Sequence, residues 1–288
     1  MEIMIKKMGW LIYSKKDALE NSSYIDWFIE EARLQNLNLI LVLREDLTIG
    51  LINNELTVQL HQKQVNLPQF AVVRTVEPIL SLHLELAGIK VFNSSKISYI
   101  CNHKSLTHLE MNRLNIPMVD MNFMKKEHLS ETAPMSFPFV IKEATGRSGK
   151  QVYMIQNEQD WEQYYQEPDE TDLVIQSTQV QTGKDVRVFI VGKEIVGAVL
   201  RENKNDFRAN FKLGGTATWY PLHSGQIKMI NKIIHHFDFD MVGIDFLIGL
   251  NGEFLFNEIE DVVGSRILSK TSDINILEIY IAHIRDNI

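Results

Sequence analysis

The stretch Val242 to Leu268, VGIDFLIGLNGEFLFNEIEDVVGSRIL, constrains the fold more than any other part of the chain. Two runs rich in β-branched and aromatic residues flank Asn251-Gly252, a dipeptide typical of tight hairpin turns. The sequence therefore predicts two antiparallel strands joined by a turn. Glu258 and Glu260 are two residues apart, so their side chains point to the same face of a strand. The hairpin can place that face beside Asp245.

Three carboxylates on one surface repel each other unless a cation neutralises them. Carboxylate oxygens are hard ligands of the kind that Mg²⁺ and Mn²⁺ prefer, and these ions accompany nucleotide phosphates. A solvated edge hairpin with ordinary surface acids is the alternative interpretation, because such acids also discourage edge-to-edge pairing. The hairpin alone leaves both interpretations open.

Composition and charge exclude several classes of protein. The chain has 288 residues, of which 45% are hydrophobic and 23% charged, as in soluble globular proteins. Its apolar runs are too short to span a bilayer, and its first residues lack the layout of a signal peptide. The net charge of −8 argues against a nucleic-acid partner. A single cysteine, Cys101, excludes an internal disulfide and fits a reducing cytoplasm; we interpret it as incidental and not as a nucleophile.

The first part of the chain has the pattern of a small open α/β unit. Strands are expected at residues 4–13, 37–43 and 70–75, and helices at 23–35 and 78–87. This alternation continues to about Ser95 and predicts an α/β fold class. No GxGxxG motif follows the first strand, so a dinucleotide site is not expected there.

The middle of the chain contains a glycine loop between two predicted strands, FVIK and QVYMI. Gly146, Ser148 and Gly149 lie in this loop, and Lys142 precedes it. Backbone N–H groups and nearby cations of this kind can close over phosphates. A plain surface hairpin is the alternative, because the phosphate-binding motif GxxxxGK[ST] is absent.

Several segments, taken in order, resemble the ATP-grasp superfamily and most closely the RimK-type carboxylate–amine ligases. They are NHKSLTHLEMNRLNIP, FVIKEATGRSGKQV, VIQS with DVRVFIVG, AVLRENKNDFRANFKLGG, and GIDFL with FNEIEDVVGSR. The resemblance covers roughly residues 98–268. It implies an ATP-grasp fold with α+β subdomains, preceded by a small N-terminal α/β (pre-ATP-grasp) domain. The expected domains are 1–97, a central lid subdomain at 98–178, and a C-terminal subdomain at 179–288 with the metal-binding hairpin.

The resemblance also implies an ATP-dependent ligase that forms an amide through an acylphosphate, with two Mg²⁺ ions or with Mn²⁺. Phosphoryl transfer is catalysed mainly by positioning and charge neutralisation, which suits the residue types involved. The implied metal ligands are Asp245, Glu258 and Glu260. The implied ATP-binding residues are Lys104, Lys142, Gly146, Ser148, Gly149, Gln176, Ser177, Thr178, Asp185, Arg208 and Asn210. Arg201, with Arg208 and Asn210, is the expected catalytic group, and Arg187 and Arg266 are expected to contact substrate.

The chain departs from the family pattern at two positions. Glu260 stands where the family usually has Asn, and its extra charge is expected to strengthen metal binding and to alter metal preference. Ser177 stands where Glu is common, which puts the ribose or adenine contact there in doubt. Asp261 either joins the metal site or caps the turn. Arg266 pairs either with a substrate carboxylate or with Glu260.

Three functions remain open at this stage. The first is a cytoplasmic ligase that joins an amino acid to a peptide, a carrier protein or a small amine, with no nucleic-acid or membrane partner. A non-catalytic nucleotide-binding regulatory protein and an ATP-grasp phosphotransferase are the alternatives. A homodimer is expected from the resemblance alone.

Overall fold

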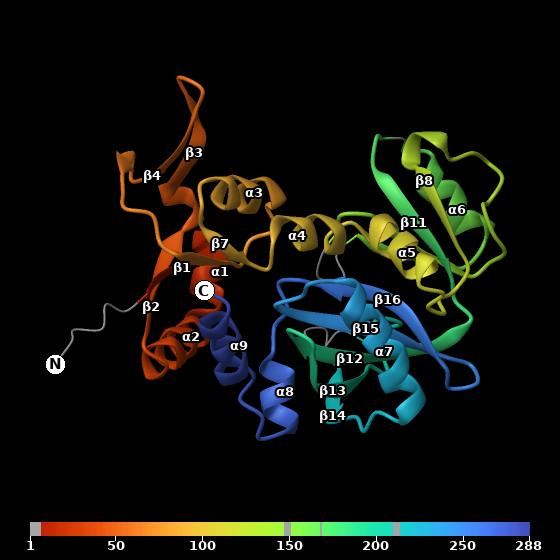
Figure 1. Ribbon diagram of the computed structural model, residues 1–288. Helices are drawn as coiled ribbons and strands as arrows, with labels where there is room; N and C mark the ends of the chain where they lie inside the picture. Colours follow the sequence, from red (N-terminus) through yellow and green to blue (C-terminus); the bar gives the residue numbers. More distant parts are fainter. Residues whose placement is uncertain (1–6, 147–150, 168, 210–213) are drawn as a thin grey trace.

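The computed structural model describes residues 7–146, 151–167, 169–209 and 214–288 (Figure 1). Within these residues the strands form four sheets. Two of them belong to the N-terminal part of the chain, one to the middle, and the largest to the C-terminal part. The mixed α/β class expected from the sequence is what the structure shows.

The first sheet is parallel and has the strand order β2-β1-β6-β7. It consists of β1 (Lys7–Tyr13), β2 (Leu37–Leu43), β6 (Phe70–Val73) and β7 (Lys90–Phe92). The connecting helices are α1 (Lys15–Glu20), α2 (Ser22–Leu34) and α3 (Pro78–Leu86), with a 3-10 turn, η1, at Arg44–Asp46. The alternation of strands and helices predicted for this segment is thus confirmed.

A small antiparallel sheet projects from this unit (Figure 1). It comprises β3 (Leu47–Ile52), β4 (Glu55–Leu60) and β5 (Lys63–Gln64). Asn53 and Asn54 form the β3–β4 turn, both with positive φ, a conformation that asparagine tolerates better than most residues. The dipeptide therefore forms the turn of a β-hairpin.

The middle of the chain forms an antiparallel sheet in the order β10-β9-β11-β8. Its strands are β8 (Met121–Lys125), β9 (Phe139–Glu143), β10 (Val152–Ile155) and β11 (Asp172–Ser177). The helices of this region are α4 (Ser95–Cys101), α5 (Lys104–Arg113) and α6 (Glu158–Tyr165), with a 3-10 turn, η2, at Lys126–His128. Trp161 of α6 is buried against Phe139 of β9, so this sheet has a core of its own.

The largest sheet is antiparallel and has the order β14-β13-β12-β15-β16. Its strands are β12 (Val180–Val191), β13 (Glu194–Glu202), β14 (Thr216–Trp219), β15 (Met241–Gly249) and β16 (Phe254–Glu260). Residues 216–219 form the edge strand β14 because they pair with β13. Ile230, Ile233 and Ile234 of α7 (Ser224–His236) pack into the core on one face of this sheet. On the opposite face, Phe189, Val191 and Val199 join the hydrophobic cluster shared with the N-terminal unit, and the rest of that face carries polar side chains.

The end of the chain returns to the N-terminal unit (Figure 1). After α8 (Arg266–Thr271), helix α9 (Ile276–Asp286) packs on α2, and Phe28 meets Tyr280 edge to face. One hydrophobic cluster therefore contains residues from both ends of the sequence. This packing holds the N-terminal sheet beside the large C-terminal sheet.

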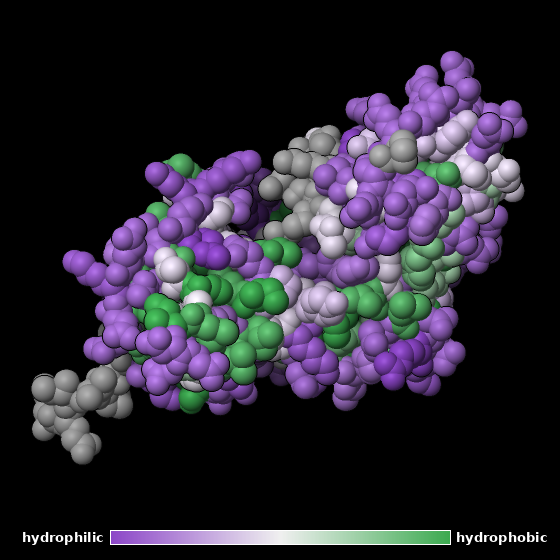
Figure 2. Space-filling model, turned by 90° about the horizontal axis from the view of Figure 1, so that it is seen from above, coloured by the Kyte–Doolittle hydropathy of each residue, from purple (hydrophilic) through white to green (hydrophobic). Residues whose placement is uncertain are grey.

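Seen from above, exposed hydrophobic residues gather on the half of the molecule that the N-terminal sheets build (Figure 2). Large apolar side chains exposed on β3 and α3 are Leu51, Ile52, Ile79, Leu82 and Leu86. None of the helices in the described part of the chain has the length and apolar character needed to cross a bilayer.

Candidate active site

A row of charged side chains crosses one face of the large sheet. Along β12, Val186, Val188 and Ile190 enter the core beneath α7, so the alternating residues Asp185 and Arg187 point to the other face. The register places Arg201 of β13 opposite Asp185, and Asp245 of β15 opposite Arg187. Strand pairing thus assembles this row from segments far apart in the sequence.

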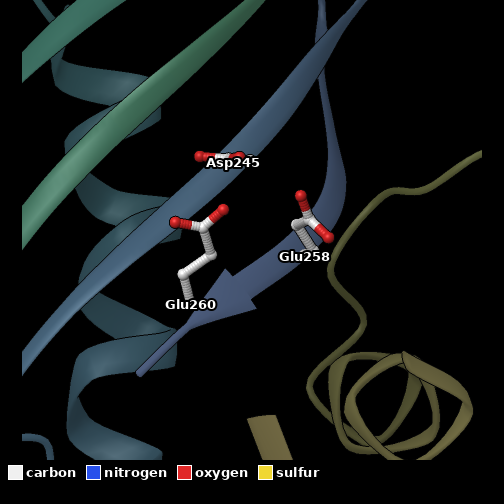
Figure 3. A group of neighbouring side chains, drawn as sticks. All are labelled: Asp245, Glu258 and Glu260. Carbon is white, nitrogen blue, oxygen red and sulfur yellow. The ribbon is translucent and has the colours of Figure 1, made fainter. Parts of the chain in front are cut away.

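Three carboxylates continue the row onto the edge of the sheet. Asp245 pairs with Glu258 across β15 and β16, and Glu260 pairs with Gly243. One carboxylate oxygen from each of Asp245, Glu258 and Glu260 lies within 4.8 Å of the others (Figure 3). The predicted hairpin and the shared face of its acids are therefore confirmed, and Gly252 in the turn has a φ of 85°.

Two arginines neutralise much of this negative charge. Arg187 donates from Nε and Nη2 to the two oxygens of Asp245, both at 2.7 Å, and from Nη2 to Oε1 of Glu260 at 2.7 Å. Arg201 donates to both oxygens of Asp185, at 2.5 and 2.7 Å, and to Oδ2 of Asp245 at 2.7 Å. Burial raises the pKa of Asp245, but the two guanidinium groups outweigh it and lower the pKa to about 2.

These pairs change the interpretation of two residues predicted from the sequence. Arg187 is buried against the carboxylates, whereas the sequence suggested a substrate contact for it. Arg201 is likewise buried between Asp185 and Asp245, which occupy its guanidinium in this structure. Both arginines hold the carboxylate cluster in place. Glu258 differs, because its half-buried carboxylate forms no hydrogen bond or ion pair in the described part of the chain and remains available to a cation.

A cleft runs from the carboxylate cluster between the middle sheet and the large sheet. It has about 900 Å³ of space between the protein atoms, open solvent at its mouth included. The predicted ATP-binding residues that line it are Lys104, Lys142, Gly146, Gln176, Ser177, Thr178, Asp185 and Arg208, together with Glu258 of the carboxylate cluster. The structure therefore brings the predicted lysines, the β11 residues and one of the metal-site acids to a single cavity.

The two lysines occupy the inner part of this cleft. Lys104 Nζ donates to the carbonyl oxygen of Gly146, and Lys142 Nζ donates to Oδ1 of Asn257 at 2.7 Å. Burial, opposed by the charge of Glu258 and assisted by that of Lys104, lowers the pKa of Lys142 to about 8. No motif in the sequence marks Asn257. Its place in β16, one residue before Glu258, was the available signal.

A buried histidine lies behind one of the cleft residues. His108 Nδ1 lies 2.7 Å from the carbonyl oxygen of Lys104, so Nδ1 carries the proton and Nε2 is the acceptor. Gln176 Nε2 lies 3.3 Å from His108 Nε2 and donates to it. Burial lowers the pKa of His108 to about 4, which keeps the ring neutral near pH 7. The histidine thus fixes the orientation of the Gln176 amide, and no sequence motif marked this role.

The remaining predicted site residues either lie outside the described residues or have protein partners. Ser148, Gly149 and Asn210 lie outside the described residues. Arg208 binds both carboxylate oxygens of Asp206, at 3.0 and 2.7 Å, at the rim of the cleft. Arg266 is exposed and donates to Oδ1 of Asn21 at 2.6 Å, whereas the ion pair of Glu260 is formed by Arg187.

Cys101 is buried in the core beneath the large sheet. Burial raises the pKa of its thiol well above the usual value. This environment suits a packing residue and not a nucleophile, because the thiolate is the reactive form.

A family model, the RimK-like ATP-grasp domain, matches residues 102–284, which contain the whole cleft and the carboxylate cluster. The chain belongs to the RimK-like ATP-grasp family. Human N-acetylaspartylglutamate synthase A is 26% identical over 249 residues, which are 80% of this chain and 63% of that protein. Glutamate--LysW ligase ArgX of Sulfurisphaera tokodaii is 25% identical over 231 residues, covering 75% of this chain and 82% of that protein.

Solved structures agree on the fold. The ATP-grasp ligase PsnB, complexed with a minimal precursor, Mg and ADP, superposes with a TM-score of 0.69 at 14% identity, over 99% of this chain and 98% of that chain. The chain therefore has the ATP-grasp fold. It spans less than two-thirds of the length of the human synthase that it matches.

Glu260, which stands where the RimK-like family usually has Asn, has an ion-pair partner in the structure. Its additional negative charge is met by Arg187, which also binds Asp245. The carboxylate is therefore stabilised even without a metal ion.

Proposed function

We propose that the protein is an ATP-dependent carboxylate–amine ligase. The observation that carries the proposal is the cluster of Asp245, Glu258 and Glu260 beside a cleft that also contains two lysines. A nucleoside triphosphate requires cationic side chains that bind its phosphates and carboxylates that bind its divalent metal ion. Membership of the RimK-like family supports the same activity.

The nucleotide is proposed to lie along the cleft between the two sheets. Gln176, Ser177 and Thr178 at the end of β11 would contact the base and ribose, and Lys104 and Lys142 the phosphates. Because His108 occupies the Gln176 amide nitrogen, the Gln176 oxygen is left to accept a hydrogen bond from the exocyclic amine of adenine. Gly146, which lines the cleft, is proposed to contact the phosphates, as are Ser148 and Gly149, which lie outside the described residues.

The carboxylate cluster fits Mg²⁺ by its chemistry. All three groups are hard oxygen donors, and Glu258 is free of ion pairs in the described part of the chain. Two ions, or Mn²⁺ in their place, are part of the proposal. When bound, they would neutralise charge on the β- and γ-phosphates.

In the proposed reaction, a substrate carboxylate oxygen attacks the γ-phosphorus and ADP leaves. The nitrogen of an amine then attacks the acyl carbon of the acylphosphate, phosphate leaves, and the nitrogen loses a proton to give the amide. Arg201 and Arg208, with Asn210, are proposed to stabilise the charge that develops. Arg187 holds Asp245 and Glu260 in position for this chemistry.

The proposed substrates are an amino acid and an amine that is free, part of a peptide or on a carrier protein. Two similar proteins carry glutamate products or substrates in their names, and PsnB was also solved with a precursor peptide. An acidic amino acid is therefore the first substrate to test. A homodimer and a cytoplasmic location are further predictions.

Release of ADP from Mg²⁺-ATP tests the proposal, with pools of amino acids and then pairs. Release should depend on a specific pair and disappear in Glu258→Gln. Glu194→Gln is the matched control, because Glu194 is exposed on the same sheet at the far end of β13. A product that retains the phosphoryl group would identify a phosphotransferase instead, and tight ATP binding without release from any pair would favour a regulatory protein.

A further inference from the structure

The parallel N-terminal sheet has a topological switch point between β1 and β6. From β1 the chain moves to β2 on one side, and later strands β6 and β7 lie on the other side. In open α/β sheets, ligands bind in the crevice outside the carboxyl ends of the strands at such a point. Here β1 ends at Tyr13, and Arg74 and Thr75 directly follow the last residue of β6. These residues therefore occupy the expected ligand position of this sheet.

Arg74 is a buried cation that has no anionic partner among the residues the structure describes. Its side chain donates from Nη2 to the carbonyl oxygen of Val263 at 2.8 Å and from Nε to the hydroxyl of Tyr13 at 3.3 Å. The ring centroids of Tyr13 and Tyr24 lie 6.0 and 5.9 Å from Cζ of Arg74. Among the described residues Arg74 forms no ion pair, and its Nη1 makes no hydrogen bond.

This situation is unusual because a buried charge costs several kcal/mol unless an opposite charge accompanies it. Arg44 shows how such a charge is usually neutralised. It follows the neighbouring parallel strand β2, and its Nε lies 2.7 Å from the Glu77 carboxylate. Arg74 is more deeply buried than Arg44, at 7% exposure, and has only neutral partners in the described part of the chain.

Thr75, at the same strand end, has a second buried polar group whose hydrogen-bonding capacity is not satisfied among the described residues. Its Oγ1 is enclosed and has no hydrogen-bond partner among the described residues. Buried hydroxyls are almost always paired, so the enclosed hydroxyl of Thr75, the residue after Arg74, calls for an acceptor. A carboxylate satisfies both groups, because it carries negative charge and accepts several hydrogen bonds.

A chain of contacts connects this point to the carboxylate cluster. Val263, whose carbonyl binds Arg74, lies three residues after Glu260. Its side chain packs over Gly243, where a Cβ would come within 2.6 Å of Val263 Cγ2 and 3.4 Å of Arg187 Cδ. Arg187 in turn binds Asp245 and Glu260. Val263 and Arg187 thus connect the Arg74 guanidinium to the proposed centre of phosphoryl transfer.

We propose that Arg74 and Thr75 bind a carboxylate of an amino-acid substrate that does not react, through Arg74 Nη1 and the Thr75 hydroxyl. This inference rests on the proposed ligase function, because it gives that reaction a substrate with a second carboxylate. It differs from the sequence interpretation, which placed substrate binding at Arg187 and Arg266. Arg187 is occupied by Asp245 and Glu260, and Arg266 contacts Asn21.

Calorimetric titration of the full chain, saturated with Mg²⁺ and a non-hydrolysable ATP analogue, tests the site. The probes are L-glutamate and its two monoamides, L-glutamine and L-isoglutamine. Wild type should bind glutamate more tightly than the monoamide that lacks the carboxylate held by Arg74. Arg74→Met should weaken glutamate binding by about tenfold or more, and it should remove that preference. Thr75→Val should weaken it by roughly threefold, and Arg44→Met should leave it unchanged.

A purely structural role for Arg74 would give a different pattern. Loss of affinity by the same factor for glutamate and both monoamides would overturn the proposal, as would wild-type affinity in Arg74→Met. Arg74→Lys, which keeps the charge, should retain part of the preference and serves if the Met variant does not fold. Binding of the ATP analogue is measured in each variant. Normal analogue binding and ADP release with no carboxylate preference would overturn this inference alone, whereas no analogue binding by wild type would overturn the ligase proposal as well.

Discussion

Arg187 binds Asp245 and Glu260 simultaneously, with all three N–O distances at 2.7 Å. Asp245 is completely buried, and Glu260 is about one-third exposed. The guanidinium therefore replaces, in the metal-free protein, part of the positive charge that a divalent cation would provide. A cation bound at the proposed metal site would compete with this guanidinium for the same carboxylates, so stability should depend on both.

Arg187→Met should lower the free energy of unfolding by about 3–5 kcal/mol in the presence of EDTA, because it leaves the buried Asp245 with one cation fewer. Added Mg²⁺ should restore part of the loss by neutralising the same carboxylates. Urea unfolding with and without Mg²⁺ measures both effects. Arg33→Met, which breaks an exposed pair with Glu30, is the control and should cost little. Equal costs for the two variants would contradict this account.

Asp245 and Glu258 should behave differently although both belong to the proposed metal site. Asp245→Asn removes the charge that two buried arginines share and should cost about 3–5 kcal/mol of unfolding free energy. Glu258→Gln should change stability by less than about 0.5 kcal/mol, because Glu258 makes no ion pair in the described part of the chain. Both variants should lose ADP release. Unfolding curves in EDTA measure the two stability changes and so distinguish the structural role of Asp245 from that of Glu258.

His108 gives the protein a specific sensitivity to acid. Its pKa falls from 6.5 to about 4 on folding because the ring is buried, so the unfolded state binds the proton more readily. The stability linked to the neutral ring is complete above 6.5 and is lost as the pH falls toward 4. Between pH 7 and pH 5 this loss amounts to about 2 kcal/mol. His108→Gln should lose that much less stability over the same interval, measured by urea unfolding.

The exposed His128 provides the comparison for this prediction. His128→Gln should follow the wild-type dependence on pH, because its ring remains in water. An acid dependence of His108→Gln that matches the wild type would show that other groups account for the effect.

The acidic hairpin could be predicted from sequence because everything that forms it is local. The turn dipeptide Asn251-Gly252 sets the pairing, and the period of two along a strand sets the faces of Glu258 and Glu260. The elements of the N-terminal sheet were also predictable, since each is an apolar run of strand length. These features depend on neighbours within one or two elements.

The partners of the acids could not be predicted in the same way. The contact of Arg187 with Asp245 depends on the register between β12 and β15, which are separated by two strands and a helix in the sequence. His108 reaches Gln176 from α5, which packs on β16, and Arg74 of the N-terminal unit reaches Val263 near the end of the chain. Such contacts depend on tertiary packing, which short-range sequence patterns do not encode.

Lys142 should make nucleotide binding depend on pH in an unusual range. Burial lowers its pKa to about 8, and only the protonated amine attracts phosphates. As the pH rises above 8, the free protein loses this charge, and the affinity for a fluorescent ADP analogue with Mg²⁺ should fall by up to about tenfold per pH unit. Lys142→Arg keeps its charge throughout, so its affinity should stay nearly constant between pH 7.5 and 9.5.

Lys184→Arg is the matched control for this titration, because Lys184 lines the same cleft but is 43% exposed and pairs with Glu202 at 2.9 Å. This variant should keep the wild-type dependence on pH. If Lys142→Arg also kept it, another group in the cleft would carry the titration, and the phosphate contact proposed for Lys142 would lose its support. A dependence abolished in Lys142→Arg and retained in Lys184→Arg assigns the titrating charge to the buried amine beside Asn257.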